Sequence, residues 1–331
     1  MRMNKRRSLF SLMLVTVFCA GVAPAAPDPG GAVRVPGAKY LFGISASPQG
    51  RVVLLYRSPQ KPEGEFGSGT PLLITLKGSP RLFPLHLPSA LDDLTIPVWN
   101  SGGRIVFLLT KAGIYSFDSA THAAKLIVPG TLAGLAISPD GTKLAYWNLG
   151  STGSHYLLSV FSLAVNRTIR KWNVPTRFDA DQYGHELVFS SDGASVLART
   201  YDEEDQTPLK QFEIASGSIR TVWQNCSGLA AGRGNTYFVG DDHGTPTLFE
   251  LQVHDLVPRK VIAPFQFDSL LSSGTRRWIV SENSRSSKFA VFDSETHNLT
   301  DLSSTCENAV VLPRGAVMCA VGGNLVSKGG Q

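Results

Sequence analysis

The chain lacks the short linear motifs that identify most catalytic and cofactor-binding sites. It contains no G-x-S-x-G nucleophile elbow, no H-E-x-x-H zinc motif, no C-x-x-C pair, no G-x-G-x-x-G segment and no phosphate loop. These absences exclude several large enzyme classes, whereas an active site assembled from separate loops would leave no linear signature. The sequence therefore predicts no catalytic, cofactor-binding or metal-binding residue.

An excess of charge of one sign is also missing once residues 1–25 are set aside. This segment has four basic residues, an apolar run from Leu9 to Val22 and the small residues Ala23-Pro24-Ala25, which is the pattern of a signal peptide cleaved after Ala25. The apolar run is shorter than the roughly 20 residues that a membrane-spanning helix needs. Without this segment, 27 basic residues stand against 26 acidic ones. This balance gives no indication of nucleic acid or an anionic membrane as a partner. We therefore expect a secreted or periplasmic monomer without stable membrane insertion.

Helical periodicity is absent too. After residue 30, no stretch repeats apolar residues at i, i+3, i+4 and i+7 for three turns. Short apolar runs occur throughout instead, such as RVVLLY (51–56) and RIVFLL (104–109), and Gly, Pro, Asn, Asp or Ser bound each of them. Runs of this length between turn-forming residues are typical of strands, so the sequence predicts an all-β fold.

One unit, an apolar strand, a Gly-containing turn and a second apolar strand, recurs about seven times. The segment ISPDGTKLAYW (137–147) is its clearest copy, and successive marker glycines lie 38 to 53 residues apart. Most units continue into a second hairpin, such as YSFDSATHAAKLI (115–127) or AVFDSETHNLTDL (290–302). Two hairpins in roughly 40 residues is the period of a four-stranded propeller blade. The marker glycines are Gly50, Gly103, Gly141, Gly193, Gly234, Gly274 and Gly315.

These markers predict that residues 26–331 form a single seven-bladed β-propeller with four-stranded antiparallel blades; six blades is the rival count. The seventh unit has too few residues after it to complete four strands. The unclaimed segment AVRVP (32–36) has the β-branched alternation of a strand. Because an open ring would expose an edge strand, we expect this N-terminal segment to complete the last blade, with Pro36 ending the pairing.

The turns resemble those of TolB-like and WD-like β-propeller repeats. Ser138-Pro139-Asp140-Gly141 is a close match, and Ser191-Asp192-Gly193 is the next. No Trp is followed by Asp, which is a departure from WD repeats of the eukaryotic type. The resemblance implies a module for protein–protein interaction in the cell envelope, and its motif carries no catalytic residue.

Three groups of polar residues were weighed as candidate sites. GDDHGT (240–245) places Asp241, Asp242 and His243 together, and YDEEDQ (201–206) gathers several carboxylates. Such residue types can bind a divalent metal or transfer protons. Adjacent residues in a Gly-flanked stretch such as GDDHGT usually form a solvated hairpin turn, and YDEEDQ lacks the ligand spacing of a calcium loop, so a solvated turn is the favoured interpretation of both. The third candidate, His185, lies near the start of an innermost strand, where we favour a core or rim position over a place in the central channel.

Three cysteines remain after removal of the signal peptide. Cys226 and Cys306 occupy equivalent positions in the fifth and seventh units. A whole blade should therefore separate them and prevent a bridge. Cys306 and Cys319 flank one hairpin instead. If a disulfide forms, the sequence favours the pair Cys306–Cys319.

Two classes of function are compatible with these observations. The first is a non-catalytic module that binds a protein partner or a ligand. The second is a propeller enzyme, such as a lyase, a lactonase or another hydrolase, with its active site at the mouth of the central channel. An enzyme should carry several His, Asp, Glu or Arg residues where the innermost strands start. Those starts are mostly Gly, Ala, Ser, Leu and Val, which favours the binding module.

Overall fold

The structure, a computed structural model, describes most of the chain between residues 32 and 328. The predicted signal peptide and His185 lie outside the described residues. Within the described part, every regular element is a β-strand, and no helix is long and apolar enough to cross a membrane. The described ranges are 32–59, 69–76, 79–89, 97–149, 155–175, 187–202, 206–252, 257–272, 276–283, 288–302, 306–313 and 315–328.

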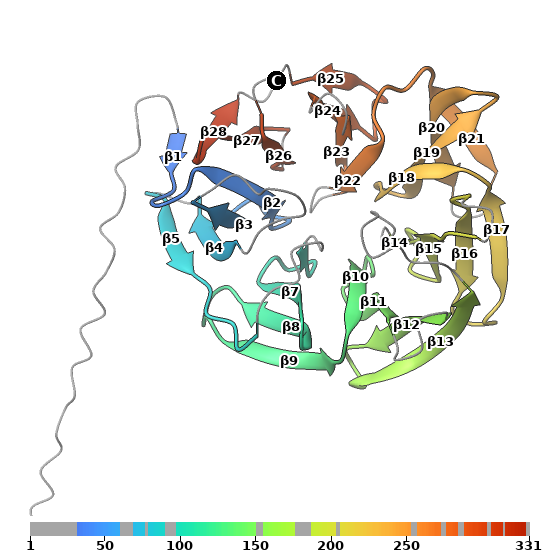
Figure 1. Cartoon of the computed structure of the whole chain (residues 1–331), viewed down its shortest axis with the longest axis horizontal. Helices are drawn as coiled ribbons and strands as arrows, with labels where there is room; N and C mark the ends of the chain where they lie inside the picture. Colours follow the sequence, from blue (N-terminus) through green and yellow to red (C-terminus); the bar gives the residue numbers. More distant parts are fainter. Residues whose placement is uncertain are drawn as a thin grey trace, which may run out of the picture.

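The strands form seven four-stranded antiparallel sheets arranged as a ring (Figure 1). Blade I contains β2 (Tyr40–Ala46), β3 (Val52–Ser58), β4 (Thr70–Thr75) and β5 (Arg81–Pro84). Blade II contains β6 (Val98–Trp99), β7 (Ile105–Thr110), β8 (Gly113–Asp118) and β9 (Ala124–Pro129). Blade III contains β10 (Leu132–Ile137), β11 (Lys143–Asn148), β12 (His155–Ser162) and β13 (Arg167–Pro175). Blade IV contains β14 (Leu187–Phe189), β15 (Ser195–Arg199), β16 (Leu209–Glu213) and β17 (Ile219–Trp223).

The remaining three blades follow in chain order. Blade V contains β18 (Cys226–Ala231), β19 (Asn235–Asp242), β20 (Thr245–Gln252) and β21 (Pro258–Ile262). Blade VI contains β22 (Ser269–Ser272), β23 (Trp278–Asn283), β24 (Lys288–Asp293) and β25 (Leu299–Asp301). Blade VII contains β26 (Asn308–Val311), β27 (Val317–Val321) and β28 (Asn324–Lys328), with β1 (Ala32–Arg34) as its fourth strand. The prediction of seven blades is therefore confirmed, and the rival count of six is wrong.

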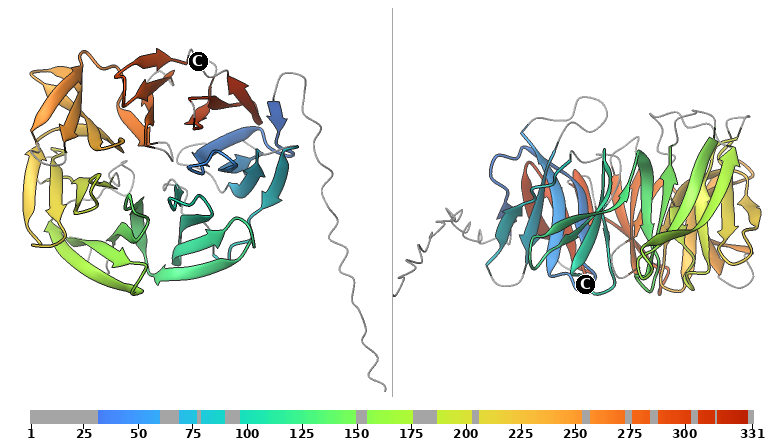
Figure 2. Two further views of the ribbon diagram at one scale, coloured as in Figure 1. Left: turned by 180° about the vertical axis from the view of Figure 1, so that it is seen from behind. Right: turned by 90° about the horizontal axis from the view of Figure 1, so that it is seen from below.

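The ring has two faces that differ in their connections (Figure 2). In blades I to VI the first strand lies at the centre and the chain moves outward, strand by strand; in blade VII the order from the centre is β26, β27, β28 and β1. The turns between first and second strands, and between third and fourth strands, therefore lie on one face, which we call the turn face. The connections between second and third strands, and the links between blades, lie on the other face, which we call the loop face.

The marker glycines occupy equivalent turns, which is why they predicted the blade count. Each lies between the first and second strands of its blade, on the turn face. All six described markers have a positive φ, between 63° and 91°, which glycine adopts without a steric penalty. Gly274, the seventh, lies outside the described residues. The repeated turn is thus a backbone requirement of the blade.

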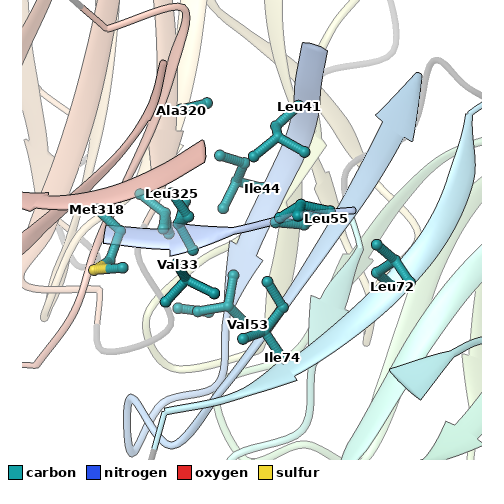
Figure 3. Close-up of a cluster of buried hydrophobic side chains, with 13 residues drawn as sticks. Val33, Leu41, Ile44, Val53, Leu55, Leu72, Ile74, Met318, Ala320 and Leu325 are labelled. Atoms are coloured by element: carbon teal, nitrogen blue, oxygen red, sulfur yellow. The ribbon is translucent and has the colours of Figure 1, made fainter. Parts of the chain in front are cut away.

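The N-terminal strand closes the ring as predicted. β1 pairs with β28 in antiparallel register, with Val33 opposite Leu325. The Val35 N–H donates one more hydrogen bond to the Gly323 carbonyl at 3.3 Å, and the pairing stops before Pro36. Val33 packs into an apolar cluster with side chains of blades I and VII (Figure 3). One short strand therefore joins the two ends of the propeller by both backbone pairing and side-chain burial.

The apolar core lies between neighbouring blades. Between blades III and IV, the buried rings of Trp147 and Trp172 meet the edge of Phe212 with ring centroids 6.4 and 5.5 Å apart. Such pairs add packing energy to the burial of large aromatic surfaces. Each blade is thus held by both of its neighbours, and a blade on its own would leave such surfaces exposed.

Candidate functional site

The Ser-x-Asp-Gly turns of the turn face use their polar groups within the turn. In blade III, Ser138 Oγ donates to Asp140 at 2.5 Å, and the Thr142 N–H donates to the same oxygen at 3.0 Å. Burial acts to raise the pKa of Asp140, but hydrogen bonds from Ser138 and Thr142 outweigh it and hold that pKa well below its ordinary value. In blade IV, Ser190 Oγ donates to Asp192 at 2.6 Å. These carboxylates therefore stabilise the turns.

Neighbouring turns touch one another around the centre of the ring. A Cβ atom added at Gly193 would lie 3.5 Å from Pro139, in the turn of the preceding blade. Ser191 Oγ donates to the Gly234 carbonyl of the following blade at 2.7 Å. Between blades VII and I, Gly50 packs against Pro313 in the same manner. The inner turns thus form an interlocked collar on the turn face.

Arg276 crosses this collar. It belongs to the turn between β22 and β23 of blade VI, and its Nη2 atom donates a hydrogen bond of 2.8 Å to the Ile137 carbonyl of blade III. Two blades separate these partners on one side of the ring and three on the other. Burial lowers the pKa of Arg276 to about 10, and the attraction of Asp140 opposes this shift. A partly buried guanidinium therefore lies at the centre of the turn face.

A second polar cluster lies on the loop face, where β15, β18 and β22 approach one another. Arg199, at the end of β15, is only 6% exposed, and its Nη1 atom donates to the Ser227 carbonyl in β18. The same guanidinium lies 5.8 Å from the ring centroid of Tyr201. Arg199 thus connects blades IV and V at the inner end of the loop face.

An acidic pair extends this cluster into blade VI. The Asp268 N–H, just before β22, donates to the Glu282 carbonyl at 3.0 Å. Burial and the nearby Asp268 carboxylate raise the pKa of Glu282. A Cβ atom added at Gly228 would lie 2.8 Å from the Asp268 carbonyl, so blades V and VI are in close contact here. A carboxyl group with a raised pKa is able to exchange protons. No pattern in the sequence indicates this cluster because its residues come from three blades.

The candidates named from the sequence occupy turns. Asp241 accepts a hydrogen bond of 2.5 Å from the Gly244 N–H, and Asp242 forms an ion pair with Lys260. The His243 side chain is 99% exposed. GDDHGT is therefore a two-residue hairpin turn on the loop face, as favoured. Of YDEEDQ, Asp202 accepts a hydrogen bond of 2.9 Å from the Gln206 N–H, and residues 203–205 lie outside the described residues. In the described ranges, no three His, Cys, Asp or Glu residues are grouped so as to hold a metal ion.

The cysteines divide as the sequence spacing indicates. Cys306 and Cys319 form a disulfide within blade VII, with an S–S distance of 2.03 Å and a Cα–Cα distance of 5.2 Å. Cys226 is a buried free thiol at the start of β18. The bridge joins the segment leading into β26 to β27, so it lies in the blade that closes the ring.

A polar seam joins blades V and VI on the turn face, and we define it by Asn235, Tyr237, Glu250, Ser294 and His297. The Glu250 carboxyl group is 8% exposed and accepts hydrogen bonds from Asn235 and, at 3.2 Å, from Tyr237 Oη. Tyr237 Oη also lies 3.0 Å from the Ser294 carbonyl of blade VI. His297 Nε2 stands 3.9 Å from Glu250 and 3.5 Å from Tyr237 Oη. Burial and the charge of Glu250 raise the pKa of Tyr237 far above its ordinary value.

The segment that carries His297 has a counterpart in blade II. FDSETH (292–297) and FDSATH (117–122) form the same turn, in which the histidine has a φ of 58° or 59°. In both turns the histidine stacks on the phenylalanine of its own segment, with ring centroids about 6 Å apart. His122, however, reaches Phe83 of blade I at 4.8 Å instead of a carboxyl group. Identical turns therefore meet different chemistry on the preceding blade.

Together these contacts define a seven-bladed β-propeller closed by its N-terminal strand. No protein-family model matches the chain, and no curated protein matches it in sequence. Solved structures do resemble it. The oligogalacturonate lyase from Vibrio parahaemolyticus has a TM-score of 0.64 and 12% identity, over 90% of this chain and 93% of that one. TolB from Acinetobacter baumannii has a TM-score of 0.52 and 14% identity, over 80% of this chain and 66% of that one.

A chain of the mitotic checkpoint complex is also similar, with a TM-score of 0.59 and 12% identity over 98% of both chains. These neighbours include an enzyme and a component of a protein assembly. At such identities the likeness shows the fold alone. Function therefore has to be argued from the residues of this chain.

Proposed function

We propose that the protein is a non-catalytic binding module that presents its loop face to a protein partner or a ligand. The observation that carries this proposal is the difference between the two faces. On the turn face the inner turns are short, alike and interlocked. On the loop face the described connections differ in length, from two residues between β7 and β8 to six, residues 263–268, between β21 and β22. Binding residues gather on variable loops held by a rigid scaffold.

Rigidity of the scaffold supports the same proposal. The ring is closed by β1, every sheet has four strands, and the collar of turns links neighbouring blades. A platform that does not reorganise loses less entropy on binding, so more of the contact energy contributes to affinity. The partner would meet a surface already held in place.

Photo-crosslinking tests this orientation. A photoreactive residue is placed on the loop face at Lys111 or Ser227 and, as a matched control, on the turn face at Gln49 or Ser216; all four positions are exposed. In the native host, we expect adducts of one size from the loop-face positions and none from the turn-face positions. Adducts from the turn face alone, or none at any position, would contradict the proposal.

Export forms part of this proposal. The composition of residues 1–25 supports cleavage after Ala25 and a secreted or periplasmic location. The Cys306–Cys319 disulfide is consistent with an oxidising compartment, because such bonds are rare in the cytosol. N-terminal sequencing of the protein from its host should begin at Ala26, and an intact Met1 would contradict export.

A second candidate function is an enzyme acting at the inner end of the loop face. It is favoured by the cluster of Arg199, Asp268 and Glu282, since burial gives Glu282 the raised pKa of a proton-transferring group. Lyase, lactonase and other hydrolase substrates would be tested with the wild type and with Glu282→Gln. Turnover that disappears in this variant, but persists in Glu295→Gln on the turn face, would establish the enzyme.

A further inference from the structure

We propose that Arg276 forms a binding site for a carboxylate group at the centre of the turn face. This site lies at the opposite end of the ring axis from the loop face, and it does not depend on the function proposed for that face. It is carried by the position of Arg276, the few partners of its guanidinium and its backbone conformation.

The guanidinium has more donors than the described protein uses. An arginine side chain has five N–H donors in a planar arrangement. Within the described ranges, the Arg276 side chain makes a single hydrogen bond, to the neutral Ile137 carbonyl at 2.8 Å. A charge taken out of water is costly unless an opposite charge and hydrogen bonds compensate for it. A bound anion would supply both.

Asp140 is near Arg276 but does not provide this compensation by contact. One of its oxygens accepts hydrogen bonds from Ser138 and Thr142, and the other accepts a bond of 2.8 Å from Thr142 Oγ1 and lies 3.7 Å from Lys143 Nζ. Its attraction for Arg276 acts at longer range and only partly opposes the lowering of the Arg276 pKa by burial. Both oxygens of the Asp140 carboxylate therefore already accept hydrogen bonds within the turn.

The backbone at Arg276 is unusual for a side chain of this size. Its φ is 60°, in the left-handed region that glycine adopts freely and that arginine adopts at a cost. The inner turns of the other blades place glycine at their positive φ. A non-glycine residue held in such a conformation is a marker of functional constraint. Here the guanidinium reaches across the ring to the Ile137 carbonyl of blade III.

The chemistry favours a carboxylate over a more highly charged anion. One guanidinium offers one positive charge, and its parallel N–H groups match the two oxygens of a carboxylate. Asp140 nearby would repel a second negative charge more strongly than the first. A monoanionic carboxylate, from a small organic acid or from the C-terminus of a peptide, therefore fits the site better than phosphate.

Titration of the mature protein labelled with ¹⁵N-arginine tests the proposal. The Arg276 side-chain resonance is identified by its loss in Arg276→Lys. We expect saturable shifts of this resonance with acetate or with triglycine, and none with sodium chloride at equal ionic strength or with triglycine amide. Binding of acetate alone identifies a small acid as the source, and binding of triglycine alone identifies a chain terminus. The absence of saturation by both would overturn the proposal.

Matched variants separate binding from folding, and their affinities are measured by titration calorimetry because the Arg276 variants lack the Arg276 resonance. Arg276→Gln should weaken carboxylate binding at least tenfold, whereas Arg104→Gln, which alters a paired arginine of the same face, should leave it unchanged. Asp140→Asn should strengthen phosphate binding about three- to tenfold, and Asp192→Asn in the equivalent turn should not. If Arg276→Gln does not fold, Arg276→Lys still provides the test, because loss of bidentate geometry should weaken acetate about fivefold. Unchanged affinity in Arg276→Lys would overturn the proposal.

Discussion

The seam that closes the ring and the polar seam between blades V and VI hold neighbouring parts of the molecule in different ways. At the closing seam, Val33 is buried among apolar side chains such as Leu325 and Met318, and β1 adds a backbone ladder (Figure 3). At the polar seam, Tyr237 Oη forms one hydrogen bond to Glu250 within blade V and one to the Ser294 carbonyl of blade VI.

The two seams are therefore sensitive to different kinds of change. Apolar burial is non-directional and scales with the area removed from water, so the closing seam depends on the presence of the strand as a whole. A buried hydrogen-bonded carboxyl group depends on each partner, because one lost partner leaves a polar group unsatisfied. The closing seam should therefore fail through truncation, and the polar seam through single substitutions.

Removal of β1 is expected to have the largest effect. A mature protein that starts at Lys39 loses the burial of Val33 and Val35, which are 7% and 2% exposed, and it exposes the edge of β28. Two buried valines contribute about 3–6 kcal/mol to the free energy of unfolding. We expect a loss of this size or aggregation, measured by urea unfolding and light scattering. An unchanged midpoint with a monodisperse protein would show that β1 is dispensable.

Breaking the polar seam at Glu250 should cost less. Glu250→Ala removes the acceptor for Asn235 and Tyr237 in a buried site. Hydrogen bonds to a charged group contribute roughly 1.5–3 kcal/mol, so we expect the free energy of unfolding to fall by about 2–3 kcal/mol. Glu213 lies in the third strand of blade IV, as Glu250 does in blade V. Glu213→Ala serves as the control because that side chain is less buried. Equal losses in both variants would contradict the role given to the polar seam.

Substitution of the two turn histidines tests how much each side chain contributes to stability. Asparagine tolerates the positive φ of both positions, so His122→Asn and His297→Asn test the side chains and not the backbone. Both variants lose ring contacts, about 0.5–1 kcal/mol. His297→Asn also loses its neighbours Tyr237 and Glu250, and we expect a cost about 1 kcal/mol larger. Equal midpoints in thermal unfolding would show that the polar seam does not use His297.

Acid should have the smallest effect at the Arg104–Asp118 pair of blade II, which lies within one blade. A hydrogen bond from Arg104 lowers the pKa of Asp118 to about 2, below its ordinary value of 3.8. A carboxyl group whose pKa is lower in the folded state stabilises the fold above its unfolded pKa, and this stabilisation is lost as the pH falls from about 4 toward 2.

We expect the stability advantage of the wild type over Asp118→Asn to be under about 1 kcal/mol at pH 5, because Arg104 is exposed and solvent screens the pair. Urea unfolding at pH 5 and pH 2.5 measures it, and the advantage should be smaller at the lower pH. An advantage that grows on acidification would contradict the stabilisation of the fold by ionised Asp118.

Much of the fold could be predicted because it repeats. Gly141 and Gly193 mark turns whose backbone requires a positive φ, so a local requirement recurs once per blade and gives the blade count. The closing strand could be predicted because the last unit lacks one strand and the N-terminal segment 32–36 has the alternating pattern of a strand that no other unit uses. The spacing of Cys306 and Cys319 around one hairpin indicated the pair that is bridged.

The sites could not be predicted because they join residues without a fixed spacing. Arg276 and Ile137 meet across the ring, although they are 139 positions apart in the chain. The contact of Arg199 with Ser227 depends on which blades are neighbours. His122 and His297 show the limit most clearly, since the same six-residue pattern gives the same turn and a different neighbouring surface. Export of the chain stays a prediction.

Closure by β1 also constrains the order in which the protein folds. Val33 leaves the ribosome at the beginning of synthesis, whereas its partner Leu325 leaves near the end. Contacts between residues so distant in sequence form late, since the chain must first lose the entropy of a very long loop. The first strand made is therefore the last to be placed, and it has to remain unpaired while the other blades assemble. A chaperone that holds this segment until the ring closes would protect the strand on which the finished ring depends.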